Sequence, residues 1–291
     1  MDIVLALVAA FFFALGLVLQ EKAASQKSAD DVGAGFLIRL VQEPVWLLGF
    51  AAQGLGFAAQ AVALAIGRMV IVQPLLVATI VFALPIARVL TKRRIRRIEW
   101  VGALVVTGGL AALLIVSKTS EGSDDASIGV WLAVGGACVG IALVLYLLAR
   151  GRSPALRAGL LGTAAGILFG FAAALTKATM SRFDEGILDV VWDWHLYALI
   201  AVSVAAFWLQ QAALQTGALS AAVASNMAFD PLSSIPLGII IFDEQLHEST
   251  VGITVSILAL GVTLFGLVLL ARAKGAGPPV AARLQPAPAA G

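Results

Sequence analysis

The sequence predicts an all-α integral membrane protein with nine transmembrane helices, arranged as two inverted four-helix repeats joined by a fifth helix. Three observations lead to this prediction. Hydrophobic residues make up 60% of the 291 residues and charged residues only 12%, which leaves too little polar surface for a soluble particle. Nine stretches supply the roughly 20 apolar residues that a membrane-spanning helix needs. A residue pattern from the first half of the chain also recurs in the second half.

The recurrence keeps an offset of 150 positions. The matched residues are Phe57, Gln60, Ala63, Leu64 and Gly67, which recur as Phe207, Gln210, Ala213, Leu214 and Gly217, and Val101, Gly102, Val105 and Leu110, which recur as Val251, Gly252, Val255 and Leu260. Corresponding helices are five apart in chain order, so the two copies cross the membrane in opposite directions. Inverted repeats are typical of secondary transporters, whose substrate site lies between the copies near the bilayer midplane.

The elements follow in order along the chain. The predicted spans are 3–20, 46–66, 69–90, 99–117, 128–149, 157–179, 195–215, 218–241 and 249–271. We expect residues 1–117 to form the first repeat, 118–156 an external acidic loop with the connecting helix, 157–272 the second repeat, and 273–291 a disordered cytoplasmic tail. Segments 27–45 and 181–194 are too polar to span the membrane and are predicted to be re-entrant or interfacial pieces.

The placement of Lys and Arg predicts the orientation of the chain. With the N-terminus outside, fifteen of the nineteen basic residues fall in cytoplasmic segments and four on the opposite side, as the positive-inside rule requires. An even number of helices would spoil this asymmetry. We therefore expect a multi-pass protein of the cell (plasma) membrane, with the N-terminus outside and the C-terminus in the cytoplasm.

The eighth predicted helix holds the strongest candidate for a functional site. Asp230 lies near its centre, followed by Pro231 and Pro236. A carboxylate inside the membrane is costly and indicates function by default, and each proline frees a backbone carbonyl. Asn226, Asp230 and Ser233 share one face at helical spacing. The alternative is an Asp that accepts hydrogen bonds from neighbouring helices and only stabilises a kink.

Glutamines are the other candidates for contact with a substrate. The third helix, which is the repeat partner of the eighth, carries Gln73 before Pro74 but no acid, so any site is asymmetric. Helices two and seven add Gln53, Gln60 and Gln210. Such glutamines either bind solute or bridge helices. Because Gln60 and Gln210 are matched by the repeat, they are the pair favoured for the cavity.

Two further polar sets are assigned structural roles. Lys22 and Lys177 end equivalent helices and are expected to extend to the membrane interface. An interfacial aromatic belt is predicted at the start of the seventh helix, formed by Trp192, Trp194, His195 and Tyr197.

Small residues are predicted to serve packing rather than chemistry. The single cysteine, Cys138, is expected to be a small buried hydrophobe. Helix packing is the role expected of Gly162, Gly166 and Gly170. The sequence has no nucleotide-binding, metalloprotease or serine-hydrolase motif and only two histidines, so we expect no enzyme activity and no cofactor.

Several runs carry a resemblance to a known family. They are the stretch from Trp46 to Val116, the run LVLQEKAA that ends the first helix, VQPLL in the third, and LQQAALQTGALSAAVAS across the seventh and eighth. These runs resemble the drug/metabolite transporter (DMT) superfamily, which includes EamA-like proteins. They are most similar to its NIPA-like branch, whose members are described as nine-helix magnesium transporters. The resemblance implies a DMT-type transporter fold.

One departure from the NIPA-like pattern bears on the substrate. Where that pattern has an acid in the second helix, this chain has Gln53, and Mg²⁺ prefers carboxylate oxygens. The first hypothesis is therefore a secondary transporter that moves a small polar or amphipathic solute by alternating access, with proton coupling at Asp230. The alternatives are a NIPA-like magnesium transporter, with Asp230 as its metal ligand, and a non-transporting membrane scaffold. The expected partners are the lipid bilayer and a small-molecule or ion substrate, with a homodimer left open and nucleic acid excluded.

Overall fold

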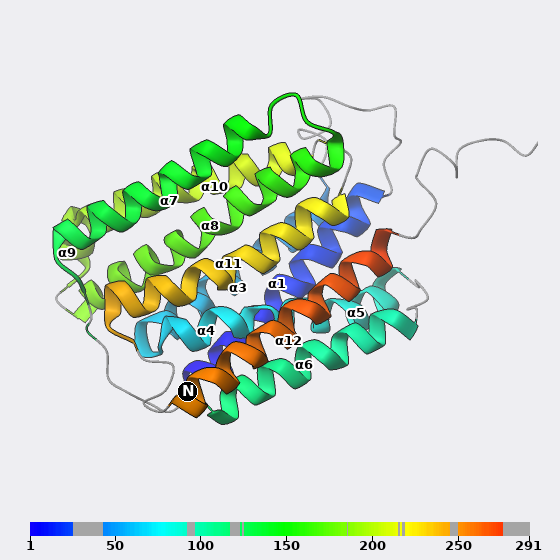
Figure 1. The fold of residues 1–291 in the computed structure, drawn as a ribbon, viewed down its shortest axis with the longest axis horizontal. Coiled ribbons are helices and arrows are strands. Elements are labelled where there is room, and N and C mark those ends of the chain that lie inside the picture. Colours follow the sequence, from blue (N-terminus) through cyan, green and yellow to red (C-terminus); the bar gives the residue numbers. More distant parts are fainter. Residues whose placement is uncertain are drawn as a thin grey trace, which may run out of the picture.

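The computed structural model describes residues 1–25, 43–91, 97–116, 123, 125–184, 186–214, 216, 219–244 and 250–275. These residues form a bundle of helices, and no strand occurs among them (Figure 1). The helices are α1 (Asp2–Ser25), α3 (Pro44–Ile66), α4 (Met69–Leu76), α5 (Ala78–Thr91), α6 (Arg97–Val116), α7 (Ile128–Leu148), α8 (Pro154–Ser181), α9 (Ile187–Trp192), α10 (Trp194–Leu214), α11 (Leu219–Phe242) and α12 (Thr250–Gly275), with a 3₁₀ turn at Arg182–Asp184.

Seven stretches of the described chain are long and apolar enough to cross a membrane. They are Asp2–Gln20, Pro44–Ile66, Met69–Leu90, Ile128–Leu148, Pro154–Ser181, Trp194–Ala213 and Ala224–Phe242. In α12, a shorter apolar stretch runs from Val251 to Gly266. This confirms an all-α, multi-pass membrane protein, whereas the count of nine spans stays a prediction.

The outer surface of the bundle is apolar, as a lipid-facing surface must be. Large hydrophobic side chains are exposed along α6, α7, α10 and α12, among them Leu104, Leu132, Val204 and Leu258. Soluble proteins do not expose apolar surface on this scale. The exposed faces of these helices therefore contact the hydrocarbon of the bilayer, and the polar groups of interest are to be sought inside the bundle and at its ends.

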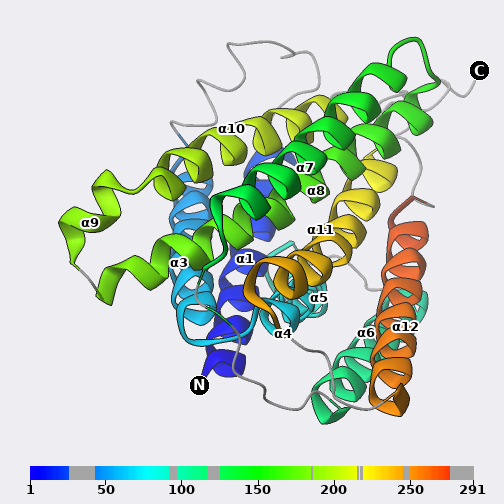
Figure 2. The same ribbon diagram turned by 60° about the vertical axis from the view of Figure 1, so that its left-hand side comes forward.

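The helix α8 is the centre of one half of the bundle. It packs against α7, α10 and α11, while α1 packs against α3 and α5 (Figure 1). Figure 2 shows α6 and α12 side by side, and these two helices form a close pair. The central position of α8 explains why most of its residues are buried, whereas α7 is largely exposed.

Glycines allow α8 and α11 to approach closely. A Cβ atom on Gly162 would lie 2.5 Å from the carbonyl oxygen of Ala222, and one on Gly166 would lie 2.6 Å from that of Asn226. A Cβ atom on Gly170 would collide with Ser233. The prediction that these three glycines serve helix packing is confirmed. Cys138 is buried, as expected.

Proline acts differently in the two helices that carry it. The predicted span 69–90 is interrupted, because α4 ends at Leu76 and α5 begins after a turn at Val77. Pro74 lies inside α4 and has no N–H to donate to the preceding turn. By contrast, α11 is continuous through Pro231 and Pro236. The third span therefore contains a one-residue turn, at which Val77 keeps right-handed helical dihedrals, whereas the eighth is continuous.

The two ends of the bundle differ in which helix ends and connections lie there. We call the end that holds the N-terminus the N-side (Figures 1 and 2). A Cβ on Gly67 would meet the side chain of Asp2, which brings the α3–α4 connection to the N-side, and α11 also ends there. The short helix α9 stands on the N-side, within the predicted interfacial or re-entrant segment 181–194, and exposes Trp192 (Figure 2). Segment 27–45 is described only for its last residues, and the tail 273–291 only as far as residue 275.

Candidate functional site

A buried carboxylate joins three helices on the N-side. Glu244 follows α11 and is 0% exposed. Its Oε1 and Oε2 accept hydrogen bonds of 2.8 Å each from the backbone N–H groups of Met69 and Val70, at the start of α4. The same carboxylate forms an ion pair with Lys177, near the end of α8. A carboxylate at a helix N-terminus is favoured both by the unpaired amides and by the helix dipole.

Lys177 does not extend to the membrane interface, so that prediction is wrong for this residue. Its side chain is 11% exposed, and its Nζ bonds Glu244 Oε1. The ammonium group also lies 4.7 Å from the ring centroid of Phe242, a cation–π contact. The carboxylate and the aromatic ring stabilise the ammonium group inside the protein. Its side chain therefore does not extend to the interface, contrary to the prediction from the sequence.

Arg68 is the other cation near this carboxylate. It is buried at the residue before α4. Burial lowers the pKa of its guanidinium, and the negative charges of Glu244 and Asp2 act in the opposite direction. Glu244 is therefore placed among two cations and two amide donors, and its charge is well compensated.

The end of α11 aims Glu244 at this site. Asp243 has a φ of 51°, in the left-handed region, which Asp tolerates better than most residues. The N–H of Glu244 then donates to the carbonyl of Gly238, in the last turns of α11, at 3.2 Å. Gly238 has no side chain to obstruct it, and a Cβ there would lie 2.7 Å from Glu244 Oε2.

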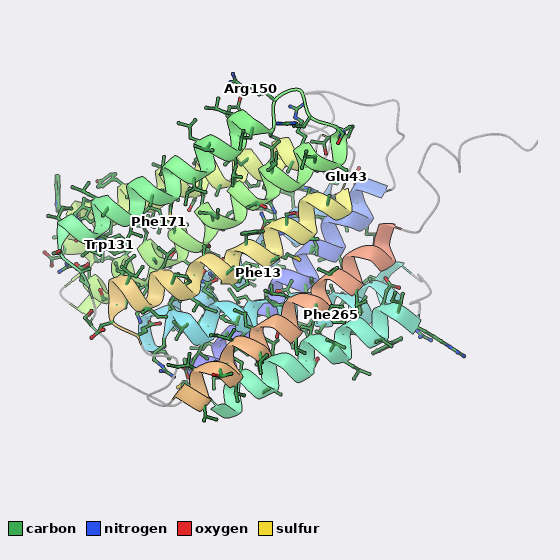
Figure 3. The ribbon with its side chains drawn as sticks, viewed as in Figure 1. Phe13, Glu43, Trp131, Arg150, Phe171 and Phe265 are labelled. Atoms are coloured by element: carbon green, nitrogen blue, oxygen red, sulfur yellow. The ribbon has the colours of Figure 1, made fainter. Side chains whose placement is uncertain are left out.

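A second polar cluster occupies the N-side between α7, α8 and α10. Asp125 accepts hydrogen bonds from Trp131 Nε1 at 2.8 Å and from Arg182 Nη2 at 2.7 Å. Asp193 caps α10 by accepting from the His195 N–H at 2.7 Å, and its Oδ1 lies 2.5 Å from His195 Nδ1. The cluster ties the loop before α7 to the start of α10. Figure 3 shows Trp131 at this end of α7 and Arg150 at the other.

This cluster corrects one member of the predicted aromatic belt. Trp192, Trp194 and Tyr197 are exposed, as an interfacial belt requires. His195 is instead buried, and its ring packs against Trp194 at a centroid distance of 3.9 Å. The sequence pattern places these aromatic residues at the helix start, but it does not say which of them turns inward.

Asp230, the strongest candidate from the sequence, is only partly paired. Its Oδ1 accepts a hydrogen bond from Ser234 Oγ at 3.3 Å. In the described part of the chain its other carboxylate oxygen has no hydrogen-bond partner, and the residue is neither fully buried nor fully exposed. Ser233 donates to the carbonyls of Phe229 and Asp230 in its own helix. Asp230 is thus not saturated by hydrogen bonds from the described residues, as a group that only stabilises a kink is expected to be.

Two further predicted side chains are buried and hold polar atoms that lack partners among the described residues. These atoms are both amide atoms of Gln73 and the Nδ2 of Asn226. Gln73 belongs to α4 and Asn226 to α11, and these helices pack against each other. Buried amides without partners are costly and are rare in folded proteins.

The start of α4 contacts the last part of α11. A Cβ on Gly238 would lie 3.4 Å from Val70 N. Val77 and Pro231 are each seven residues along the chain from this contact, which is roughly 10 Å of helix.

The predicted glutamines of helices two and seven are not joined to Asp230. Gln53 Nε2 donates to Gln20 Oε1 at 3.4 Å, which bridges α3 and α1. No hydrogen bond links Gln60 or Gln210 to Asp230 within the described residues, and both glutamines are partly buried. Of the alternatives given above for glutamine, helix bridging is the one that Gln53 adopts.

The described residues offer no ready metal site. They contain no group of three or more His, Cys, Asp or Glu side chains that could hold an ion. Since Mg²⁺ is bound through carboxylate and other oxygens, Asp230 would need oxygens from backbone, amides or water to hold it.

Sequence reasoning missed Glu244. The predicted eighth span ends at residue 241, so Glu244 lies outside the predicted spans. The available signal was a charged pair, Lys177 within one apolar helix and Glu244 directly after another. The two residues are 67 positions apart, and nothing in a single sequence pairs them.

Comparison with known proteins gives a relative but no family. No family model matches the chain, and no solved structure matches it. An uncharacterized protein of Corynebacterium glutamicum is 26% identical over 271 residues, a match that covers 92% of this chain and 92% of that protein. The similarity thus extends over nearly the full length of both chains.

Proposed function

We propose that this membrane protein is a secondary transporter of the DMT type, which moves a small polar or amphipathic solute by alternating access. The observation that carries the proposal is Asp230, a partly exposed carboxylate in mid-span with one oxygen unpartnered among the described residues. Such a group indicates function by default. In this proposal Asp230 contacts the solute or exchanges a proton during the cycle.

The turn within the third span supports the proposal. Transporters bind substrates near the midplane, where interrupted helices expose backbone groups to the site. Here the third span turns at Val77, and α4 and α11, which pack against each other, carry Gln73 and Asn226, whose buried amide atoms lack partners among the described residues. These groups supply both donors and acceptors, which suits a polar organic solute better than a bare cation.

The pairing of helices supports two equivalent units. In the proposal α1, α3, α4–α5 and α6 form one unit, α8, α10, α11 and α12 form the other, and α7 connects them. The contact of α1 with α3 has its counterpart in α8 with α10, and that of α1 with α5 in α8 with α11. Between the units, α4 meets α11 and α6 meets α12, which are equivalent helices in both cases. These pairs fit nine spans in two inverted repeats.

Glu244 acts in this proposal as the contact that closes the N-side. Its carboxylate links α4 of the first unit to α8 and α11 of the second. Alternating access requires the two units to separate at one end while they close at the other. With the N-side assigned to the outside by the positive-inside rule, the ion pair would hold the protein closed to the exterior.

The experiment that tests the function is a screen for binding of solutes. Purified protein is heated with individual metabolites and, separately, with Mg²⁺, and the unfolding temperature is recorded. A ligand that binds the folded state stabilises it by mass action. We expect stabilisation by a class of small polar or amphipathic solutes, and we expect Asp230→Asn to reduce it while the exposed Asp189→Asn does not.

The same screen decides between the alternatives. Stabilisation by Mg²⁺ alone, lost in Asp230→Asn, would replace the solute hypothesis with the NIPA-like magnesium transporter. A protein that no solute and no ion stabilises would favour the membrane scaffold, whose buried polar groups serve packing only.

A further inference from the structure

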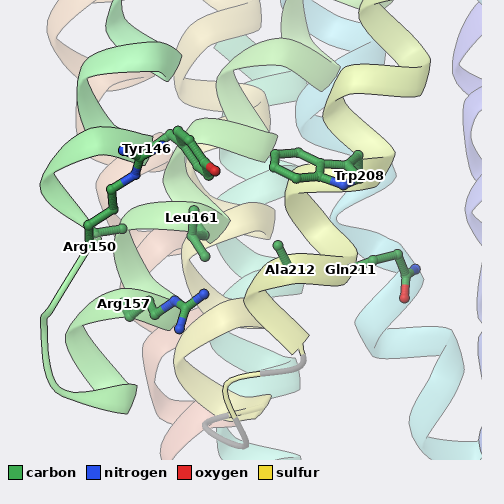
Figure 4. Close-up of a pocket in the computed structure, with 8 residues that line it drawn as sticks. Tyr146, Arg150, Arg157, Leu161, Trp208, Gln211 and Ala212 are labelled. Atoms are coloured by element: carbon green, nitrogen blue, oxygen red, sulfur yellow. The ribbon is translucent and has the colours of Figure 1, made fainter. Parts of the chain in front are cut away.

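A cavity of about 320 Å³ lies between α7, α8 and α10 (Figure 4). It is at the end of the bundle opposite the N-side, where Arg150 lies (Figure 3). The side chains that matter for its chemistry are Tyr146, Arg150, Arg157, Leu161, Trp208 and Gln211. None of the residues proposed for transport lines it. We call it the arginine cavity.

The arginine cavity carries an uncompensated positive charge. Two arginines line it, and no carboxylate does. Across the described residues neither Arg150 nor Arg157 makes an ion pair with an acid. Arg157 lies in the first turn of α8, where free amide groups and the helix dipole add positive potential. The site therefore attracts an anion, and two guanidinium groups favour the oxygens of a phosphate in particular.

Aromatic side chains form one wall of the cavity. The rings of Tyr146 and Trp208 have their centroids 5.5 Å apart, and the Arg150 guanidinium lies 5.2 Å from the Tyr146 centroid. Figure 4 shows Tyr146 and Trp208 above Arg157 and Gln211. Tyr and Trp are enriched where the hydrocarbon of a membrane meets the headgroups, so this wall marks the depth of the cavity in the bilayer.

Exposed apolar residues lead from the hydrocarbon to the cavity. Leu143 and Leu147 are exposed on α7, and Val204 and Phe207 are exposed on α10. Leu143 and Val204 lie about one turn closer to the middle of the membrane than Tyr146 and Trp208. Leu147 and Phe207 are next to those aromatic residues in the chain. A ligand that enters the cavity from the side thus passes over apolar surface and ends at two arginines, which is the profile of an amphipathic anion.

We propose that the arginine cavity binds the phosphate group of an anionic phospholipid, with the acyl chains lying against the exposed faces of α7 and α10. Arg150 and Arg157 contact the phosphate oxygens, and Trp208 packs on the glycerol region. The proposal stands apart from the transport function, because none of its residues belongs to the Asp230 region.

The experiment measures lipid binding to purified protein in a neutral detergent. Phosphatidylglycerol, phosphatidylcholine and free glycerol 3-phosphate are added separately, and the apparent affinity is obtained from the rise in unfolding temperature and from native mass spectrometry. We expect tight binding of phosphatidylglycerol, at least tenfold weaker binding of phosphatidylcholine, whose cationic choline opposes the arginines, and no binding of glycerol 3-phosphate below millimolar concentration.

Variants assign the binding to this cavity. Arg150→Gln and Arg157→Gln should each weaken phosphatidylglycerol binding roughly tenfold, the expected value of a charge-assisted hydrogen bond. Arg152→Gln is the matched control, because Arg152 is exposed in the same loop, bonds the Leu148 carbonyl and does not line the cavity. Both arginines of the cavity are exposed, so folding should survive, and elution as a single species verifies this.

Each remaining outcome contradicts the proposal. Equal binding of phosphatidylglycerol by wild type and by both single variants would place the lipid elsewhere. Equal affinity for phosphatidylcholine would remove the role of charge. Tight binding of glycerol 3-phosphate, lost in the arginine variants, would make the cavity a site for a soluble phosphate ester and overturn the lipid.

Discussion

At the residue scale, Glu244 is a charged side chain that is fully buried. A fully buried carboxylate takes two backbone N–H hydrogen bonds and one ammonium contact. Removing one member of a buried pair leaves an uncompensated charge, which costs about 3–5 kcal/mol. Glu244→Gln keeps the size of the side chain but turns one acceptor into a donor facing the N–H groups of α4.

We therefore expect Glu244→Gln to lower the free energy of unfolding by about 3 kcal/mol or more, measured by denaturant unfolding in detergent. Lys177→Met should destabilise as well, and the double variant should lose less than the sum of the two, because the charges are coupled. Asp189→Asn, an exposed change, is the control and should have an effect within about 0.5 kcal/mol. Additive losses in the double variant would show that the pair is not coupled.

At the element scale, the contact of α8 with α11 depends on glycine. Gly166→Ala would bring a Cβ within 2.6 Å of the Asn226 carbonyl oxygen, which is backbone and cannot move aside. We expect a loss of about 1–3 kcal/mol, the usual cost of overpacking. Gly159→Ala in the same helix is the matched control, because its Cβ would have an ordinary 3.6 Å contact with Ser225 Oγ. If both variants unfold alike, the close packing inferred for Gly166 is wrong.

Some features of the helices could be predicted from the sequence, and others could not. Apolar length predicted the helices, and glycine spacing predicted a close packing face on α8, because both depend on local composition. That α11 is the partner was not predicted. The break at Val77 was not predicted, since nothing in Val77 itself opposes a helix and Pro74, three residues earlier, could equally have produced a kink. The pairing of Lys177 with Glu244 depends on how distant helices meet, which local patterns do not contain.

At the scale of the whole molecule, the bundle has two chemically distinct ends. The N-side holds two closed, well-paired polar clusters, around Glu244 and Asp125, whereas the opposite end holds the open arginine cavity. The apolar stretches of the sequence predicted the spans and singled out Asp230 as a carboxylate within one of them. The internal repeat predicted how the spans are arranged. The difference between the ends arises from tertiary contacts and could not be read from the sequence.

Orientation of the whole molecule follows from the positive-inside rule and can be measured by thiol labelling in intact cells. Cys138 is first replaced by Ala, and single cysteines are then introduced at Ser127, before α7, and at Ser153, before α8. Both positions are exposed and lie at opposite ends of α7. We expect an impermeant thiol reagent to label position 127 and to spare position 153. The reverse pattern would place the N-terminus in the cytoplasm.

The central claim is that Asp230 works in transport, and reconstituted transport tests it most directly. Wild type, Asp230→Asn and the control Asp189→Asn are placed in proteoliposomes, and uptake of the solute that best stabilises the protein is followed with and without an imposed proton gradient. We predict that the gradient drives uptake in wild type and in Asp189→Asn, and that Asp230→Asn loses gradient-driven uptake while solute exchange persists. Gradient-driven uptake at the wild-type rate in well-folded Asp230→Asn would contradict the account and return α11 to a packing role.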